Sequence, residues 1–212
     1  DLFYMHRRDP TIPVEDVTET LAGLIKAGKI KQFGYSEIAP TTLARAAAVH
    51  PVGAVQSEYS LSTRFPDLGL LQTCAELGVA LVAFSPLGRS LLTNNPIPRE
   101  RILTLPFLAG NPRFIEPNLT ENLRITDGFR NLAKEMGASA AGLANAWLLT
   151  RGSHVLPIPG TRSVEHFRES MSGASLILSE TDLEQIETVL PIGWAHGDRY
   201  SREQWDGPER YC

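Results

Sequence analysis

Short apolar runs alternate with amphipathic stretches along most of this chain. Five apolar runs predict β-strands, at residues 2–5, 30–34, 54–56, 80–84 and 155–158. Apolar residues recur at helical spacing between the runs, and they predict helices at residues 14–25, 40–50, 70–77, 119–136, 138–149 and 164–171. Strands that alternate with helices are typical of βαβ units and of a parallel α/β sheet.

The number of predicted strands favours an incomplete barrel. A parallel (β/α)8 TIM barrel takes about 30 residues per unit, so this chain covers about five βα units and lacks about 90 residues. An open doubly wound sheet is the alternative, but it usually carries a Gly-rich turn after its first strand. No G-x-G-x-x-G sequence follows any predicted strand. The segment 88–117 contains five prolines, and we expect an extended loop over the strand ends.

Composition narrows the class of protein. The net charge of −4 shows no basic patch, so we expect no nucleic-acid partner. No apolar run approaches the ~18 residues that cross a membrane, so no membrane association is expected. The two cysteines, Cys74 and Cys212, cannot form a disulfide framework, and Cys74 is expected to be a small core residue. These features favour a cytoplasmic protein.

Each predicted strand ends in polar or conformationally special residues. The endings begin at His6, Tyr35, Gln56, Phe84 and Pro157. In parallel barrels the carboxyl ends of the strands meet at one rim, where active sites are built. We therefore expect the five endings to converge on one pocket. No cluster of His, Cys or Asp has the spacing of metal ligands, so no metal is expected.

The same endings resemble the aldo-keto reductases, a family of NADPH-dependent (β/α)8 barrels that reduce aldehydes and ketones. The matching segments are D-L-F-Y-M-H-R-R-D-P, G-K-I-K-Q-F-G-Y-S-E, V-Q-S-E-Y-S-L, V-A-F-S-P-L-G-R and P-I-P-G-T-R-S-V-E-H-F-R-E-S. Their order follows the family's fourth to eighth strands. The resemblance implies one domain over residues 1–212, a partial barrel that lacks the N-terminal strands. Because the chain opens at Asp1 rather than at methionine, we expect a longer parent protein.

The resemblance gives His6 a catalytic role. In the family, hydride passes from the nicotinamide to the carbonyl carbon, a tyrosine supplies the proton, and this histidine orients the carbonyl oxygen. A donor placed where charge develops lowers the barrier appreciably. The family's aspartate, tyrosine and lysine lie on earlier strands, and no residue of this chain matches them. We therefore expect the chain alone to be inactive as a reductase.

The nicotinamide end of NADP(H) is implied to lie at three strand ends. Ser36 and Gln56 match the residues that bind the carboxamide, and Glu37 stands where many members have asparagine. Phe84 stands at the aromatic position that stacks on the nicotinamide ring, and stacking needs only a π face.

The pyrophosphate is implied to lie on the turn after the fourth predicted strand. This turn consists of Ser85, Pro86, Leu87 and Gly88. Exposed backbone N–H groups in such a turn bind anions, and Arg89 beside it adds positive charge.

The adenosine end is implied to lie on the turn and helix that follow the last predicted strand. The matching residues are Gly160, Thr161, Arg162, His166, Glu169 and Ser170. A helix N-terminus favours phosphate, and Thr161 and Arg162 suit the 2′-phosphate, so NADPH is expected rather than NADH. His166 stands where members often have arginine or lysine, and Glu169 and Ser170 match the pair that faces the adenine.

We thus predict an NADPH-dependent oxidoreductase that acts on a small-molecule carbonyl substrate, with the activity residing in the parent protein. The alternative is a non-catalytic subunit of the same fold that binds or senses NADP(H). A third reading is a five-strand fragment that folds only by pairing with another segment, since an open sheet leaves two strand edges unpaired. No motif indicates which carbonyl is reduced or which oligomer forms.

Overall fold

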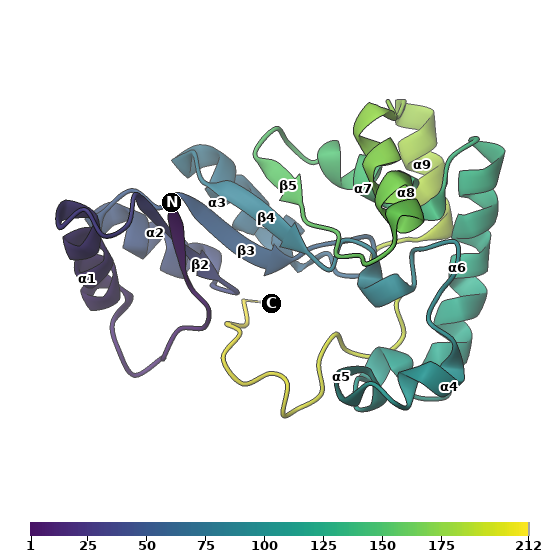
Figure 1. Cartoon of the computed structure of the whole chain (residues 1–212), viewed down its shortest axis with the longest axis horizontal. Helices are drawn as coiled ribbons and strands as arrows, with labels where there is room; N and C mark the ends of the chain where they lie inside the picture. Colours follow the sequence, from purple (N-terminus) through teal and green to yellow (C-terminus); the bar gives the residue numbers. More distant parts are fainter. Residues whose placement is uncertain (212) are drawn as a thin grey trace.

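A five-stranded parallel sheet runs through the computed structural model, which describes residues 1–211 (Figure 1). The strands lie in chain order and are β1 (Leu2–Met5), β2 (Gln32–Ser36), β3 (Ala54–Glu58), β4 (Ala80–Phe84) and β5 (Val155–Pro157). Because all four strand pairs are parallel, the carboxyl ends of the strands share one edge. The predicted parallel α/β sheet is confirmed. Cys212 lies outside the described residues.

Two strands reach further toward this edge than their apolar runs predict. β2 begins at Gln32 rather than at residue 30 and ends at Ser36. β3 continues beyond Gln56 to Glu58, which pairs with Phe84. The bounds differ because the backbone ladder, and not the hydrophobicity of the side chains, decides where a strand ends.

Six helices agree with the predicted pattern to within a few residues. They are α1 (Val14–Lys26), α2 (Pro40–Val49), α3 (Leu70–Leu77), α6 (Asn118–Glu135), α7 (Ala140–Leu149) and α8 (Val164–Ser172). The sequence pattern did not predict three others, α4 (Arg99–Ile102), α5 (Pro106–Ala109) and α9 (Glu180–Val189). Short 3-10 helices span Phe65–Leu68, Gly88–Ser90, Pro112–Phe114 and Gly173–Ser175. Within residues 1–211, no helix has the length and apolar character that a membrane span requires.

The segment 88–117 is folded, so the expectation of an extended loop is wrong. It contains α4, α5 and two of the 3-10 helices. Its apolar side chains form a small cluster of their own, made of Leu91, Ile102, Leu108 and Phe114 together with Leu119 of α6. Burial of these side chains stabilises the segment although it has little regular structure.

The main core lies between the sheet and the helices that cover it. One row of side chains crosses all five strands on the helix-covered face and consists of Met5, Tyr35, Val55, Leu81 and Val155. Successive residues of a strand point to opposite faces. The neighbouring row, made of Ser36, Gln56, Val82 and Leu156, therefore lies on the other face, where Leu156 is 50% exposed.

Cys74 of α3 is buried in this core as a free thiol, as predicted from its place in an amphipathic helix. Burial raises the pKa of the thiol to about 12, so it stays protonated.

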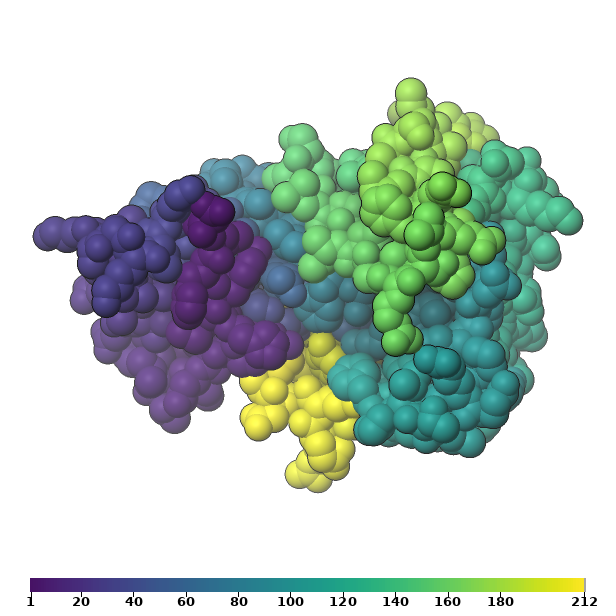
Figure 2. Space-filling model, viewed as in Figure 1, coloured from purple at the N-terminus to yellow at the C-terminus, as the bar shows by residue number. Residues whose placement is uncertain are grey.

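The C-terminal tail, residues 191–211, runs back across the strand-end edge of the sheet (Figure 1). The amide of Glu209 donates to the carbonyl of Glu37 (2.8 Å) just after β2. Nε2 of Gln204 donates to the carbonyl of Phe107 in α5 (2.9 Å). In Figure 2 the tail occupies the space between the N-terminal segment and the region of α4 and α5. The tail therefore contacts both the N-terminal strands and the α5 region along the strand-end edge.

Candidate active site

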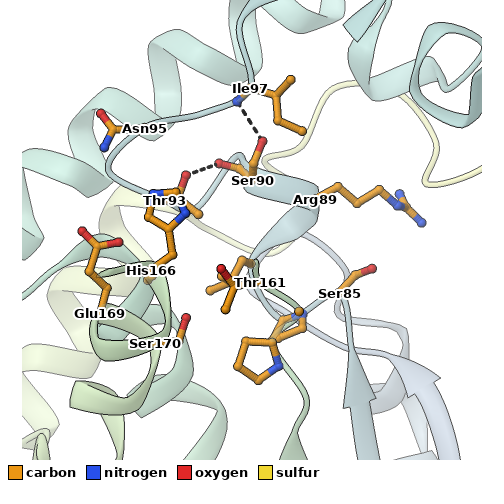
Figure 3. A pocket seen from close by; sticks show the side chains of 15 residues that line it. Ser85, Arg89, Ser90, Thr93, Asn95, Ile97, Thr161, His166, Glu169 and Ser170 are labelled. Carbon is orange, nitrogen blue, oxygen red and sulfur yellow. Dashed lines mark hydrogen bonds between the residues drawn. The ribbon is translucent and has the colours of Figure 1, made fainter. Parts of the chain in front are cut away.

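A cavity of about 420 Å³ opens beyond the carboxyl ends of β4 and β5 (Figure 3). Its wall comes from the turn after β4, the segment after β5 and α8. Nine of the residues expected to bind NADP(H) line it: Ser85, Pro86, Leu87, Arg89, Gly160, Thr161, His166, Glu169 and Ser170. The fold thus brings the expected pyrophosphate and adenosine segments together, although they lie about 75 residues apart in the sequence, as the separation of Ser85 and Gly160 shows. Their role in binding stays a prediction.

The backbone of the turn after β4 has the form of an anion-binding nest. Leu87 is near the right-handed region, with φ −97° and ψ 17°, and Gly88 follows with φ +55°. Alternation of right- and left-handed residues is typical of such nests. Within this turn the amide of Gly88 donates to the carbonyl of Ser85 (3.0 Å), so a bound anion would rely on the neighbouring amides. Ser85, Arg89 and Ser90 also have positive φ, at 50°, 54° and 84°. Non-glycine residues in this region cost about 1–3 kcal/mol each, and they persist where the surroundings hold them.

The segment that follows this turn completes the cavity wall, and sequence reasoning did not assign it. Ser90 and Thr93 are part of the wall, and so are Asn95 and Ile97. The hydroxyl of Ser90 accepts from the amide of Ile97 (3.0 Å), and the hydroxyl of Thr93 donates to the carbonyl of Ser90 (2.8 Å), as drawn in Figure 3. These bonds fold the segment back on itself, and the length of the irregular stretch is the one sequence signal for it.

Hydrogen bonds also fix the turn that leads into α8. The hydroxyl of Ser163 caps the helix by accepting from the amide of His166 (3.4 Å). Oγ1 of Thr161 accepts from the amide of Ser163 (3.1 Å). Arg162 and His166 are exposed at this positive end of the helix, and Arg162 lies outside the residues that line the cavity. The corner suits a phosphate group that approaches from solvent.

The residues expected at the nicotinamide end lie on the open face of the sheet rather than in this cavity. Ser36 and Gln56 are paired neighbours there, and Phe84 ends β4 two residues beyond Val82 on the same face. His6 follows β1 at the same edge and is exposed. These side chains share the rim with the cavity but do not line it, so the expected convergence of the strand endings is confirmed for the rim and not for one pocket.

Glu37 and Arg89, which are expected to contact the cofactor, form ion pairs within the protein. The carboxylate of Glu37 pairs with Arg199 of the tail, and it also accepts from the amide of Glu58 (2.7 Å). The guanidinium of Arg89 pairs with the carboxylate of Glu58 (2.6 Å), and in Figure 3 it points away from Thr161 and His166. Direct contact of Glu37 or Arg89 with the cofactor stays a prediction, and their ion pairs are the interactions present.

A family model of the aldo/keto reductase family matches residues 1–191 of this chain. The chain belongs to that family. The match covers each strand of the sheet, so the resemblance to the aldo-keto reductases inferred from the strand endings is confirmed.

Two curated aldo-keto reductases illustrate the relationship. A probable aldo-keto reductase 1 of Glycine max is 40% identical over 94% of this chain and 58% of its own length. The aldo-keto reductase str7 of Strobilurus tenacellus is 36% identical over 95% of this chain and 61% of its own length. The chain therefore spans about three fifths of the relatives that it matches.

Solved aldo-keto reductase structures carry the same fold. The glycerol dehydrogenase AKR11B4 from Gluconobacter oxydans superposes with a TM-score of 0.77 at 24% identity, over 90% of this chain and 58% of that one. The thermostable aldo-keto reductase Tm1743, solved with the inhibitor epalrestat, gives a TM-score of 0.68 at 27% identity over 89% and 59%. These neighbours are TIM barrels, so the five strands are part of that architecture.

Proposed function

We propose that this chain is the cofactor-binding part of an NADPH-dependent oxidoreductase that reduces aldehydes or ketones to alcohols. The observation that carries the proposal is the cavity between the nest after β4 and the N-terminus of α8. Two anion-favouring backbone elements in the wall of one cavity suit a dinucleotide, whose pyrophosphate and 2′-phosphate lie at a distance from each other. Aldo-keto reductases generally use a nicotinamide cofactor. The membership of this chain in that family and its fold support oxidoreductase activity in general.

The fit of NADP(H) is favoured by charge as well as shape. Thr161 and His166 line the cavity near the exposed cation of Arg162, and these groups suit a 2′-phosphate. Glu169 and Ser170 lie further along α8, where the adenine is proposed to bind. At the other end, Ser36 and Gln56 provide the polar groups for a carboxamide.

When bound, the nicotinamide would supply the hydride, and the residues of this chain would orient the partners. His6 at the end of β1 is placed to donate a hydrogen bond to the carbonyl oxygen, where negative charge develops. Tyr4 lies two residues earlier, on β1, but its ring packs against Gly34 and burial raises its pKa. We propose that the proton comes from the rest of the reductase, because this chain spans only part of its relatives.

Cofactor titration and a turnover assay test the proposal separately. We expect NADPH to bind to this chain more tightly than NADH, in a titration that follows the fluorescence of the reduced nicotinamide. We expect the parent reductase, which contains this chain, to oxidise NADPH when an aldehyde or ketone is supplied. Failure of both NADPH and NADP⁺ to bind would overturn the proposal. Tight binding without turnover of any carbonyl in that longer form would instead favour the sensing role.

A further inference from the structure

Five charged side chains are packed together where the tail crosses the strand ends. They come from the ends of β2 and β3, the turn after β4, the segment before α6, and the tail. We call them the charged cluster: Glu37, Glu58, Arg89, Arg113 and Arg199. Glu58 is 1% exposed and Arg199 is 3% exposed, so these ions are removed from water. The cluster is separate from the cavity wall except for Arg89, which belongs to both.

Arg199 joins the two carboxylates of the cluster. Its Nη2 donates to Glu37, and its Nη1 lies 3.5 Å from the carboxylate of Glu58. Its backbone carbonyl accepts from Nη1 of Arg89 (3.0 Å). The rings of Tyr200 and Trp205 cover the guanidinium, with centroids 4.6 and 4.7 Å from its central carbon. One tail residue thus holds three separate segments of the rim.

The charge balance makes Arg199 hard to replace. Burial opposes its charge, but the pairs with Glu37 and Glu58 outweigh burial and raise its pKa above the ordinary value. Burial lowers the pKa of Arg113 to about 10, although Glu58 opposes that change. Removal of one partner from a buried cluster leaves an uncompensated charge. A buried ionic cluster adds little to stability compared with apolar packing, which suggests a role in fixing geometry.

Both carboxylates that Arg199 contacts lie next to a residue expected at the nicotinamide end. Glu37 directly follows Ser36, and its φ of +57° is a left-handed conformation that an ordinary side chain rarely adopts. Glu58 is paired with Phe84 across the sheet. The side-chain anchor at Glu37 therefore sets the direction in which the chain leaves Ser36.

We propose that Arg199 is a positioning residue for the nicotinamide end of the cofactor site. It does not touch the cofactor; it holds the chain at Glu37, Glu58 and Arg89 so that Ser36 and Phe84 face the carboxamide and the ring. The tail is in this way a structural part of the cofactor site. The inference rests on the proposed function, because it assigns a role within the same NADP(H) site.

The affinities for two ligands distinguish a positioning role of Arg199 from a general effect on stability. NADPH spans both ends of the site, whereas 2′,5′-ADP carries only the end that binds near α8. We expect Arg199→Gln to weaken NADPH by about tenfold or more, because the hydrogen-bonding geometry at the carboxamide is lost. We expect its affinity for 2′,5′-ADP to change by less than about twofold, because Thr161, His166 and Glu169 have no contact with the tail in the interactions described.

Further variants, in the tail and in the Arg199–Glu37 ion pair, serve as controls for this test. Arg202→Gln changes an exposed tail arginine and should leave both affinities unchanged. Arg199→Lys keeps the charge but loses the two-pronged geometry, so it should show a smaller loss that is again confined to NADPH. Adding Glu37→Gln to Arg199→Gln removes the uncompensated carboxylate and should recover part of the NADPH affinity. If the glutamine variant does not fold, the lysine variant carries the comparison.

The outcomes are distinguishable. Equal weakening of both ligands, or unchanged NADPH affinity in a folded Arg199→Gln protein, would overturn the positioning role while the proposed function stands. Failure of the unmodified chain to bind either ligand would overturn the proposed function and the inference that depends on it.

Discussion

The guanidinium of Arg7 donates a hydrogen bond to the hydroxyl of Ser36, with 2.9 Å between Nη1 and Oγ. The same nitrogen donates to the carbonyl of His6 (2.6 Å). A fixed positive charge therefore lies between the expected catalytic histidine and the expected carboxamide-binding serine. In the proposed binding mode, Arg7 therefore places a cation beside the nicotinamide ring, which changes charge during the reaction.

Replacement of Arg7 should alter the preference between the two oxidation states of the cofactor. Oxidised nicotinamide is positively charged and is repelled by Arg7, whereas the reduced ring is neutral. We expect Arg7→Gln to tighten NADP⁺ relative to NADPH by about threefold, a modest change because the site is partly hydrated. Titration of both forms measures the ratio. Arg168→Gln, at an exposed site on α8, is the control, and an unchanged ratio in Arg7→Gln would contradict the prediction.

His6 should affect turnover without affecting cofactor affinity. We expect His6→Ala to lower kcat by about 100-fold, the effect of removing one donor from a developing oxyanion. The affinity for NADPH should remain, because the expected cofactor contacts lie on other strands. Steady-state kinetics in the longest active form of the protein give kcat, and titration gives the affinity. A variant with normal kcat would remove His6 from the catalytic group.

Arg162 should distinguish NADPH from NADH. We expect Arg162→Gln to weaken NADPH by about tenfold through loss of a charge-assisted hydrogen bond and to leave NADH nearly unchanged. Parallel titrations with both cofactors measure the effect. Equal losses for the two cofactors would mean that Arg162 does not meet the 2′-phosphate.

Two glycine substitutions should have opposite effects on stability. A Cβ at Gly34 would lie 2.6 Å from the carbonyl oxygen of Ala54 and 2.7 Å from the ring of Tyr4, so Gly34→Ala should destabilise the fold by about 1–3 kcal/mol. Gly23 is an exposed position in α1 with open space around it, so Gly23→Ala should stabilise by about 0.5–1 kcal/mol. Urea unfolding measures both changes. Similar shifts for the two variants would contradict the close packing at Gly34.

Glu209 should make the docking of the tail sensitive to acid. Burial opposes its charge, but bonds from the amide of Ala39 and from Arg8 outweigh burial and hold the pKa below its ordinary value of 4.5. A lowered folded pKa contributes stability that is complete above the ordinary value and is lost as the pH falls through the folded pKa.

Unfolding experiments between neutral and acidic pH test this dependence. Glu209→Gln should be less stable than the unmodified chain at neutral pH, and the difference should shrink as the pH falls below 4.5. Glu184→Gln, an exposed change on α9, should show no such convergence. A constant difference at all pH values would exclude the carboxylate of Glu209 as its source.

The end of β3 shows a structural feature that the sequence pattern does not predict. The apolar run predicts a strand that ends at Gln56, because glutamate is rarely buried. Glu58 is nevertheless buried in the strand, since Arg89 and Arg199 neutralise it from 31 and 141 residues away. A local pattern cannot supply partners at such distances, so the charged cluster was not predictable.

Site residues that lie in short contiguous motifs are easier to predict from the sequence. The turns that start at Ser85 and Gly160 were assigned from contiguous motifs, and both line the cavity. The wall from Ser90 to Ile97 was not assigned, because it depends on how a long segment folds back. The capping box of Ser179 and Asp182 is a sequence signal for the start of α9. The apolar pattern of α9 is weak, so this helix is not predicted.

The tail contacts also set an order of events during synthesis. Arg199 meets Glu37 across 162 residues, and Glu209 meets Arg8 across 201. A nascent chain emerges from the ribosome N-terminus first, so the strands of the sheet are available before the tail can form its contacts with the rim. Until residue 199 emerges, Glu37 lacks its guanidinium partner and Glu58 has only Arg89 and Arg113, so the rim stays open to chaperones and proteases. A product truncated in the tail would keep its strands and cavity-forming motifs and yet present an unfinished rim to cellular quality control.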